Sequence, residues 1–266
     1  MPLYDAIGSA WARLAGRPSM RRINLVLFQL GGRGLGLLNY RNRDISGEEA
    51  FIRHALSSAD APVVFDVGAN EGQWSSYAMS VNPTAKIFAF EPHPQTYARL
   101  VSKLPNVRAF NLGLGERQGP LMLHDYAEGS GSSHASFVDG VIENVHGRKA
   151  ATLQVEVTTL DEIASAEGVD EINLLKIDVE GMELAVLRGA QRLLERGAVK
   201  RIQFEFNEMN ILSRTLFADF HALLAPRYHL HRLLPHGWLD IDRYNPWTHE
   251  QFVFQNIVAE LRPGAA

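Results

Sequence analysis

The segment VVFDVGANEGQWSSYA, residues 63–78, constrains the fold more than any other part of the chain. A run of apolar β-forming residues leads into a turn with Gly68 and Gly72, and a helical pattern begins at Trp74. Strand, glycine turn and helix in this order are typical of a parallel sheet, which binds ligands beyond the carboxyl ends of its strands. Glycines in such a turn allow positive φ angles and leave room for a ligand against the backbone.

The same alternation of strand and helix continues along the chain and predicts an α/β fold. Strand-like runs include KIFAFE, VRAFNL, INLLKIDVEG and RIQFEF, and helices are predicted over residues 95–104, 182–196 and 216–224. The pattern indicates a mostly parallel sheet with helices on both faces. Residues 120–158 interrupt it with two strand-like runs around a Gly- and Ser-rich loop, and HLHRLL and QFVFQNIVAE add two strands near the end.

Residues 1–59 are predicted to form a helical extension ahead of the main domain, residues 60–266. The first 45 residues contain seven arginines and two aspartates. Four apolar residues of this segment fall on one helical face: Leu3, Ile7, Trp11 and Leu14. We expect this helix to pack on the main domain; the alternative is a basic amphipathic surface for peripheral contact with anionic lipid or a lipid-linked substrate.

Composition narrows the class of protein. The 266 residues are 46% hydrophobic and carry a net charge of −4, so a large core is expected and nucleic-acid binding is not. The absence of cysteine excludes disulfides and cysteine-ligated zinc. The apolar stretch from Ile23 to Gly32 is shorter than the roughly 20 residues of a membrane-spanning helix, and no small-residue cleavage site follows it. We expect a soluble cytoplasmic protein.

The turn after the first strand indicates a nucleoside cofactor. It lacks the G-x-G-x-x-G cradle of dinucleotide sites, so NAD is disfavoured. Glu91 ends the second strand, where a carboxylate can accept hydrogen bonds from both ribose hydroxyls. A ribose without a pyrophosphate suggests S-adenosylmethionine. Asp66 could face the cationic amino-acid end of that cofactor or merely pin the loop, and Asn111 is placed to meet the adenine region.

Six motifs, FDVGANEGQWS, AFEPHP, NLGLGE, TTLDEI, LLKIDVEGMELAVLRGA and FVFQNIVA, resemble in this order the FkbM family of methyltransferases, over about residues 60–261. The resemblance implies the class I methyltransferase fold, a Rossmann-like seven-stranded sheet whose last strand is antiparallel, with S-adenosylmethionine over the ends of strands one and two. It implies that the cofactor pocket is lined by Asp66, Gly68, Asn70, Gly72, Glu91 and Asn111. The predicted cofactor-binding set also includes Ala69, Pro92, Gly113 and Asp178.

The motif KIDVEG supplies the candidate catalytic carboxylates. Methyl transfer from a sulfonium is an in-line displacement, so the protein must align the acceptor and remove its proton. Asp178 and Glu180 alternate along the strand and are predicted to point to one side, where one would have the raised pKa of a general base. They could instead bind a divalent cation, cap the next helix or pair with Lys176. Glu205 and Glu208 are expected at the same rim, and Asp178 with Glu205 is the candidate metal pair.

Other candidates lie in the loops. His134 in GSGSSHAS is predicted to be catalytic, because such loops close over substrates, and His93 is expected to shape the ribose pocket. In the tail, Trp238, Tyr244 and Trp247 with nearby carboxylates suit the faces and hydroxyls of a sugar, or else cover the sheet edge.

We therefore expect an S-adenosylmethionine-dependent O-methyltransferase that acts on a hydroxyl of a saccharide, glycolipid or secondary metabolite, the acceptors that the resemblance implies. One alternative is a nucleotide-sugar oxidoreductase, but the sequence shows neither a nicotinamide cradle nor a tyrosine–lysine pair. The other is a non-catalytic docking protein that uses the basic amino-terminal segment. Only the methyltransferase requires Glu91 for cofactor affinity.

Overall fold

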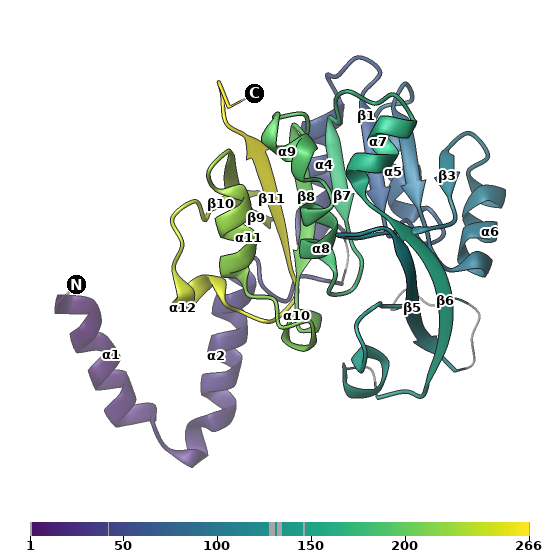
Figure 1. The fold of residues 1–266 in the computed structure, drawn as a ribbon. Helices are drawn as coiled ribbons and strands as arrows, with labels where there is room; N and C mark the ends of the chain where they lie inside the picture. Colours follow the sequence, from purple (N-terminus) through teal and green to yellow (C-terminus); the bar gives the residue numbers. More distant parts are fainter. Residues whose placement is uncertain (1, 42, 128–130, 132–134, 146, 266) are drawn as a thin grey trace.

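The computed structural model describes residues 2–41, 43–127, 131, 135–145 and 147–265 (Figure 1). Its main sheet has the strand order β10-β9-β11-β8-β7-β1-β2-β3. The strands are β1 (Val63–Val67), β2 (Lys86–Phe90), β3 (Arg108–Phe110), β7 (Leu174–Ile177), β8 (Arg201–Phe206), β9 (Tyr228–Leu234), β10 (Gly237–Asp240) and β11 (Gln255–Leu261). Strands β3, β2, β1, β7 and β8 pair in parallel, and β11 runs antiparallel between β8 and β9. The predicted class I methyltransferase fold is confirmed.

The sheet has eight strands rather than the expected seven. The additional strand, β10, pairs antiparallel with β9 across a turn formed by Pro235 and His236. The four residues GWLD are too few to show the period of two that marks a strand in sequence. Pairing with β9 is what makes them a strand.

Helices cover both faces of the sheet, as predicted. One face carries α7 (Leu160–Ala166), α8 (Glu183–Arg188), α9 (Gln191–Glu195) and α11 (Phe217–Leu224), and the other carries α4 (Glu48–Leu56), α5 (Gln73–Val81) and α6 (Pro94–Lys103). Short helices α3 (Arg43–Ser46), α10 (Met209–Leu212) and α12 (Pro246–His249) lie in connections. Neighbouring residues of a strand point to opposite faces, so Phe65 packs in one core and Val64 in the other.

The helix predicted over residues 182–196 is two short helices, α8 and α9, separated at Gly189. A Cβ atom on Gly189 would overlap the carbonyl oxygen of Gly115, so the backbone lies directly against a neighbouring loop. Asp161 accepts hydrogen bonds from the backbone N–H groups of Arg192 and Leu193 at 2.8 and 3.0 Å and caps the second helix. These contacts come from distant segments, so local periodicity did not reveal the break.

The interruption predicted at residues 120–158 is a second sheet of strand order β4-β6-β5. Its strands are β4 (Gly113–Leu114), β5 (Gly119–Tyr126) and β6 (Ala150–Thr158), and a π-helical turn covers Val141–Val145. β5 and β6 form a long antiparallel ribbon that extends beyond the main sheet (Figure 1). Both predicted strand-like runs are confirmed.

The amino-terminal segment forms α1 (Pro2–Ala15), the 3-10 turn η1 (Pro18–Met20) and α2 (Arg21–Gly34), which project from the body (Figure 1). The expectation that the first helix packs on the main domain is wrong, because the apolar face predicted for α1 is exposed. The extension is helical, but α4 within it packs into the core, and the boundary at residues 59 and 60 stays a prediction. No helix in the described ranges has the length and apolar character needed to cross a membrane.

Candidate functional site

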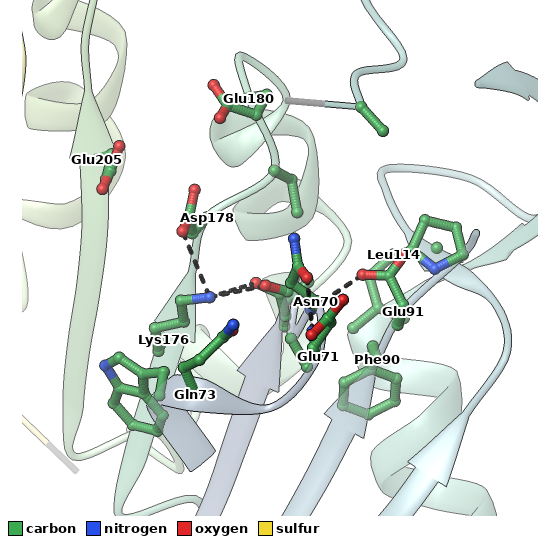
Figure 2. Close-up of a pocket in the computed structure, with 18 of the residues that line it drawn as sticks. Asn70, Glu71, Gln73, Phe90, Glu91, Leu114, Lys176, Asp178, Glu180 and Glu205 are labelled. Atoms are coloured by element: carbon green, nitrogen blue, oxygen red, sulfur yellow. Dashed lines mark hydrogen bonds and ion pairs between the residues drawn. The ribbon is translucent and has the colours of Figure 1, made fainter. Parts of the chain in front are cut away.

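A cavity of about 630 Å³ opens at the carboxyl ends of β1, β2, β7 and β8 (Figure 2). The chain proceeds from β1 to β2 on one side and places β7 on the other, which makes the end of β1 a topological switch point. Doubly wound sheets bind ligands at such points. Predicted site residues that line the cavity are Gly68, Ala69, Asn70, Glu91, Pro92, Gly113, Asp178, Glu180 and Glu205.

The two glycines after β1 make room for the protein's own atoms. Both have positive φ, 75° for Gly68 and 84° for Gly72. A Cβ on Gly68 would overlap the carbonyl oxygen of Asp178, and one on Gly72 would overlap Leu100 of α6 and Leu104, which directly follows that helix. The expectation that these glycines leave room for a ligand is therefore corrected for Gly72, which packs on α6. Gly68 packs on the turn after β7 but also lines the cavity, so its predicted contact with the cofactor stays a prediction.

Glu91 is held at the cavity edge by two backbone donors. Its Oε2 accepts from the N–H of Asn70 at 3.0 Å, and its Oε1 accepts from the N–H of His93 at 2.8 Å. Burial raises the pKa of Glu91 to about 7, although both hydrogen bonds favour the charged form. Because a carboxylate has about four lone-pair sites, both oxygens can still accept from a ligand hydroxyl.

Lys176 joins the turns after β1 and β7. Its Nζ lies 3.0 Å from Asp66 Oδ1 and 3.6 Å from Asp178 Oδ2, and it donates to the carbonyl oxygen of Gly68 at 2.8 Å (Figure 2). Burial lowers the pKa of Lys176, but the charges of Asp66 and Asp178 outweigh it and raise the pKa. Asp66 is fully buried, accepts from Ser75 Oγ at 2.7 Å and does not line the cavity. It pins the loop, which was the alternative to direct cofactor contact.

Asn111 differs from expectation, whereas the two predicted histidines do not contradict it. Asn111 donates through Nδ2 to the carbonyl oxygens of Glu91 and Pro92, both at 3.0 Å, and thus ties the end of β3 to the turn after β2 instead of lining the cavity. His93 is buried behind the cavity, with Nε2 3.6 Å from Asp125, and shapes the edge through its backbone N–H. His134 lies outside the described residues.

Three carboxylates line the other side of the cavity: Asp178, Glu180 and Glu205 (Figure 2). Burial, followed by the charge of Asp178, raises the pKa of Glu180 well above its ordinary value. Burial, followed by the charges of Asp178 and Glu180, does the same for the pKa of Glu205. Asp178 pairs with Lys176, which was one of the alternatives to a role in proton transfer, so this alternative holds for one of the three carboxylates. Glu180 and Glu205 are the carboxyl groups suited to accept a proton.

The placement of Glu180 has a different cause from the alternation predicted for it. β7 ends at Ile177, so Asp178 and Glu180 belong to a turn. Glu180 adopts a left-handed φ of 53°, which is uncommon for a residue with a side chain, and Gly181 follows with 102°. Ser136 Oγ donates to the carbonyl oxygen of Glu180 at 2.6 Å and holds this turn against the loop between β5 and β6.

Sequence reasoning missed one wall of the cavity. This wall is formed by Tyr40 and Arg41, which lie in the connection after α2, and by Glu48 at the start of α4. The predicted Glu208 does not line the cavity. Glu48 accepts from Gln203 Nε2 at 2.7 Å. No local motif marks these positions, because only the fold brings them to the cavity.

The three tail aromatics predicted to bind the acceptor, Trp238, Tyr244 and Trp247, do not line the cavity. Trp238 on β10 packs edge-to-face on Phe51 and His54, with ring centroids 6.0 and 4.6 Å away. Tyr244 donates to Glu250 at 2.7 Å, and Trp247 is 83% exposed. Trp238 therefore covers the sheet edge, as the alternative had it, and the predicted role of this segment in acceptor recognition is not supported.

Within the described ranges, no group of three or more His, Cys, Asp or Glu side chains is arranged to hold a metal ion. Asp178 and Glu205 both line the cavity. A shared divalent cation stays a prediction.

The antiparallel β11 beside a parallel sheet, together with a cavity at the β1 switch point and a carboxylate after β2, defines a protein of the class I methyltransferase type. A family model described as the methyltransferase FkbM domain matches residues 66–231. The chain belongs to the FkbM methyltransferase family, and it is an enzyme of the methyltransferase class, which was the leading expectation.

Named relatives agree with this family. The chain is 26% identical over 187 residues to the 2-O-methyltransferase NoeI of Sinorhizobium fredii, covering 66% of this chain and 76% of the relative. It is 30% identical over 161 residues to the hexuronic acid methyltransferase AglP of Haloferax volcanii, covering 59% and 62%. It is 25% identical over 182 residues to the 31-O-demethyl-FK506 methyltransferase FkbM of Streptomyces tacrolimicus, covering 59% and 70%.

Proposed function

We propose that this protein is an S-adenosylmethionine-dependent O-methyltransferase whose acceptor is a hydroxyl group of a saccharide or a related small molecule. One observation carries the proposal. A single cavity has the backbone-held carboxylate of Glu91 on one side and the carboxyl groups of Glu180 and Glu205, with raised pKa, on the other.

The Glu91 side of the cavity has the chemistry to hold the cofactor. The carboxylate can accept hydrogen bonds from the two ribose hydroxyls, and its position is already fixed by the N–H groups of Asn70 and His93. Gly68, Ala69 and Pro92 offer a lining without charged side chains. When bound, S-adenosylmethionine supplies an electrophilic methyl group. About 630 Å³ lies within the range of small-molecule and cofactor sites.

The acidic side of the cavity has the chemistry to activate the acceptor. A neutral hydroxyl is a weak nucleophile, and a carboxylate that removes its proton contributes about 10²–10⁴-fold to the rate. Glu180 and Glu205 have pKa values raised by burial and by Asp178, which brings their basicity closer to that needed near neutral pH. We assign one of them as the general base.

The acceptor class is supported by the relatives, whose names specify a 2-O-methyl transfer and a hexuronic acid. The lining also suits a polyhydroxylated ligand. Carboxylates and the amides of Asn70, Gln73 and Asn256 can bond to hydroxyls, while Trp74 and Phe254 provide aromatic surface.

The direct test has two parts. Isothermal titration of the full chain with S-adenosylmethionine, S-adenosylhomocysteine and NAD should show binding of the first two and none of the third. A methyl-labelled donor should then transfer label to uronic acids and other saccharides, in assays run with and without chelator. Binding of NAD alone would refute the cofactor assignment, and label on nitrogen but never on oxygen would refute the acceptor assignment. Loss of transfer with chelator would favour the cation over the carboxylate base.

A further inference from the structure

Helices α1 and α2, residues 2–34 and here called the amino-terminal hairpin, expose an unusual amount of apolar surface. Tyr4 is 81% exposed and Phe28 is 65% exposed. The other large exposed apolar residues of the hairpin are Leu3, Ile7, Trp11, Leu14, Ile23, Leu25, Val26, Leu27 and Leu30. Clustered exposed apolar side chains mark an interaction site, whereas isolated ones do not.

Most of the exposed apolar side chains follow the helical period, although Leu25 and Phe28 lie on the opposite side of α2. On α2, Ile23, Val26, Leu27 and Leu30 follow the spacing i, i+3, i+4, i+7, so they form one stripe. The residues predicted to share a face of α1 form a second stripe. No residue of α2 is buried by the body of the protein, so neither stripe is part of the core.

The charge of the hairpin favours an anionic partner. Arg13, Arg17, Arg21 and Arg22 surround the bend between the two helices, and Asp5 is the single acidic residue in positions 1–41 of the sequence. Arginine next to an apolar stripe can extend its charged end to phosphate groups while its stem stays on apolar surface. A second copy of this chain would bring the same positive charge to the contact and would not neutralise it.

The base of the hairpin is connected to the cavity. Arg33 Nη1 donates to the carbonyl oxygen of Leu38 at 3.0 Å, and the Leu38 N–H donates to the carbonyl oxygen of Phe254 at 2.8 Å. Tyr40 packs edge-to-face on Phe254, with ring centroids 6.0 Å apart, and both line the cavity. In Figure 1 the hairpin extends from the end of the sheet where β8 leads into α10, which is the cavity end.

We propose that the amino-terminal hairpin docks this protein on an anionic lipid bilayer. The two apolar stripes lie in the boundary between headgroups and acyl chains, and the arginines of the bend contact lipid phosphates. Docking of this kind brings the carboxyl ends of the parallel strands toward the membrane surface. The inference goes beyond the proposed function and does not depend on which hydroxyl is methylated.

The test is co-sedimentation of the full chain with vesicles of phosphatidylcholine alone and with 30% phosphatidylglycerol. We expect binding to the anionic vesicles to be at least about tenfold tighter, since each basic residue near such a surface contributes about 1 kcal/mol, and to weaken at high salt. The Ile7→Glu/Leu27→Glu variant should lose binding about tenfold or more. Val101→Glu on α6, an exposed apolar position outside the hairpin, is the matched control and should bind as the wild type does.

Two further measurements make the result unambiguous. Arg13→Gln/Arg21→Gln/Arg22→Gln keeps the apolar stripes and should abolish the preference for anionic vesicles. Because the altered side chains are exposed, the unfolding temperature and S-adenosylhomocysteine affinity of the variants should match those of the wild type. Equal binding of wild type to both vesicle types would overturn the proposal. So would a dimer in light scattering that Ile7→Glu/Leu27→Glu dissociates, if no vesicle binding accompanies it.

Discussion

The two sides of the cavity hold their carboxyl groups in opposite ways. On the β1 and β2 side, Glu91 accepts from two backbone N–H groups, and Asp66 behind it accepts from Ser75 and pairs with Lys176. On the β7 and β8 side, Asp178 pairs with Lys176, while Glu180 and Glu205 both lie in the negative field of Asp178. The first arrangement fixes a binding group in place, and the second favours uptake of a proton.

The hydrogen-bonding groups and charges next to each carboxyl group explain the difference between the two sides of the cavity better than burial does. Burial raises the pKa of Glu91 as well as those of Glu180 and Glu205. For Glu91 the next largest influences are backbone hydrogen bonds that favour the charged form, whereas for the other two they are neighbouring carboxylates that disfavour it. Variants on the two sides should therefore separate cofactor binding from proton transfer.

The largest effect is expected on the acidic side. The Glu180→Gln/Glu205→Gln variant should lower kcat by about 10²–10⁴-fold, because neither carboxyl group with a raised pKa remains to take the acceptor proton, and Asp178, which stays, is paired with Lys176. Its affinity for S-adenosylhomocysteine, measured by calorimetry, should change by less than about threefold. The control is Glu208→Gln, which is outside the cavity lining. An unchanged kcat in the double variant would contradict the proposal that the β7 and β8 side of the cavity takes the acceptor proton.

Glu183 tests whether a raised pKa alone marks a proton-transfer group. Its carboxylate is buried, accepts from the N–H groups of Val179 and Gly181 at 3.1 Å, and burial raises its pKa from 4.5 to about 7. Because the folded protein binds this proton more tightly than the unfolded chain does, protonated Glu183 stabilises the fold fully below pH 4.5. The stabilisation is lost as the pH rises through 7. Between pH 4.5 and 8, the unfolding free energy of Glu183→Gln should rise relative to wild type by about 3 kcal/mol.

The measurement for Glu183 is denaturant unfolding of both proteins across that pH range. Turnover of the variant should stay within about tenfold of wild type, since Glu183 is outside the cavity lining. A loss as large as that of the acidic-side variant would show that raised pKa, rather than access to the cavity, identifies the base.

On the other side, Glu91→Ala should weaken S-adenosylhomocysteine binding by about 100-fold. Two hydrogen bonds from the ligand to a charged group are lost, and the N–H groups of Asn70 and His93 lose their acceptor. Calorimetry provides the measurement. Glu116→Ala, which removes an exposed carboxylate paired with Arg188 at 3.9 Å, is the control and should bind normally. Equal weakening in both variants would indicate a non-specific charge effect.

The smallest effect is a pH dependence of cofactor affinity. With a pKa of about 7, Glu91 is about one-tenth ionised at pH 6 and mostly ionised at pH 8. A protonated carboxyl group offers fewer acceptors to the ribose hydroxyls, so cofactor binding should be about tenfold weaker at pH 6 than at pH 8. In Glu91→Gln this dependence should disappear. A wild-type affinity that is flat from pH 6 to 8 would show that Glu91 does not hold the cofactor through its charge.

The sequence by itself determined the parallel strands around the cavity and the position of the cavity. Local periodicity identified β1, β2, β7 and β8, and parallel strands must bring their carboxyl ends to one edge of the sheet. That rule is enough to place Glu91, Asp178 and Glu205 around one cavity without knowledge of any contact. The motifs also identified the family, which the match over residues 66–231 confirmed.

Only the tertiary structure decided what each side chain touches. Gly72 packs on α6, Asp66 is held by Lys176, and Trp238 covers the sheet edge, although each had a plausible role at the ligand. The same holds for Glu48, which no motif marks, and for α1, whose apolar face stays uncovered. Periodicity records which face of an element is apolar, but the partner of that face is set by packing among segments far apart in the chain.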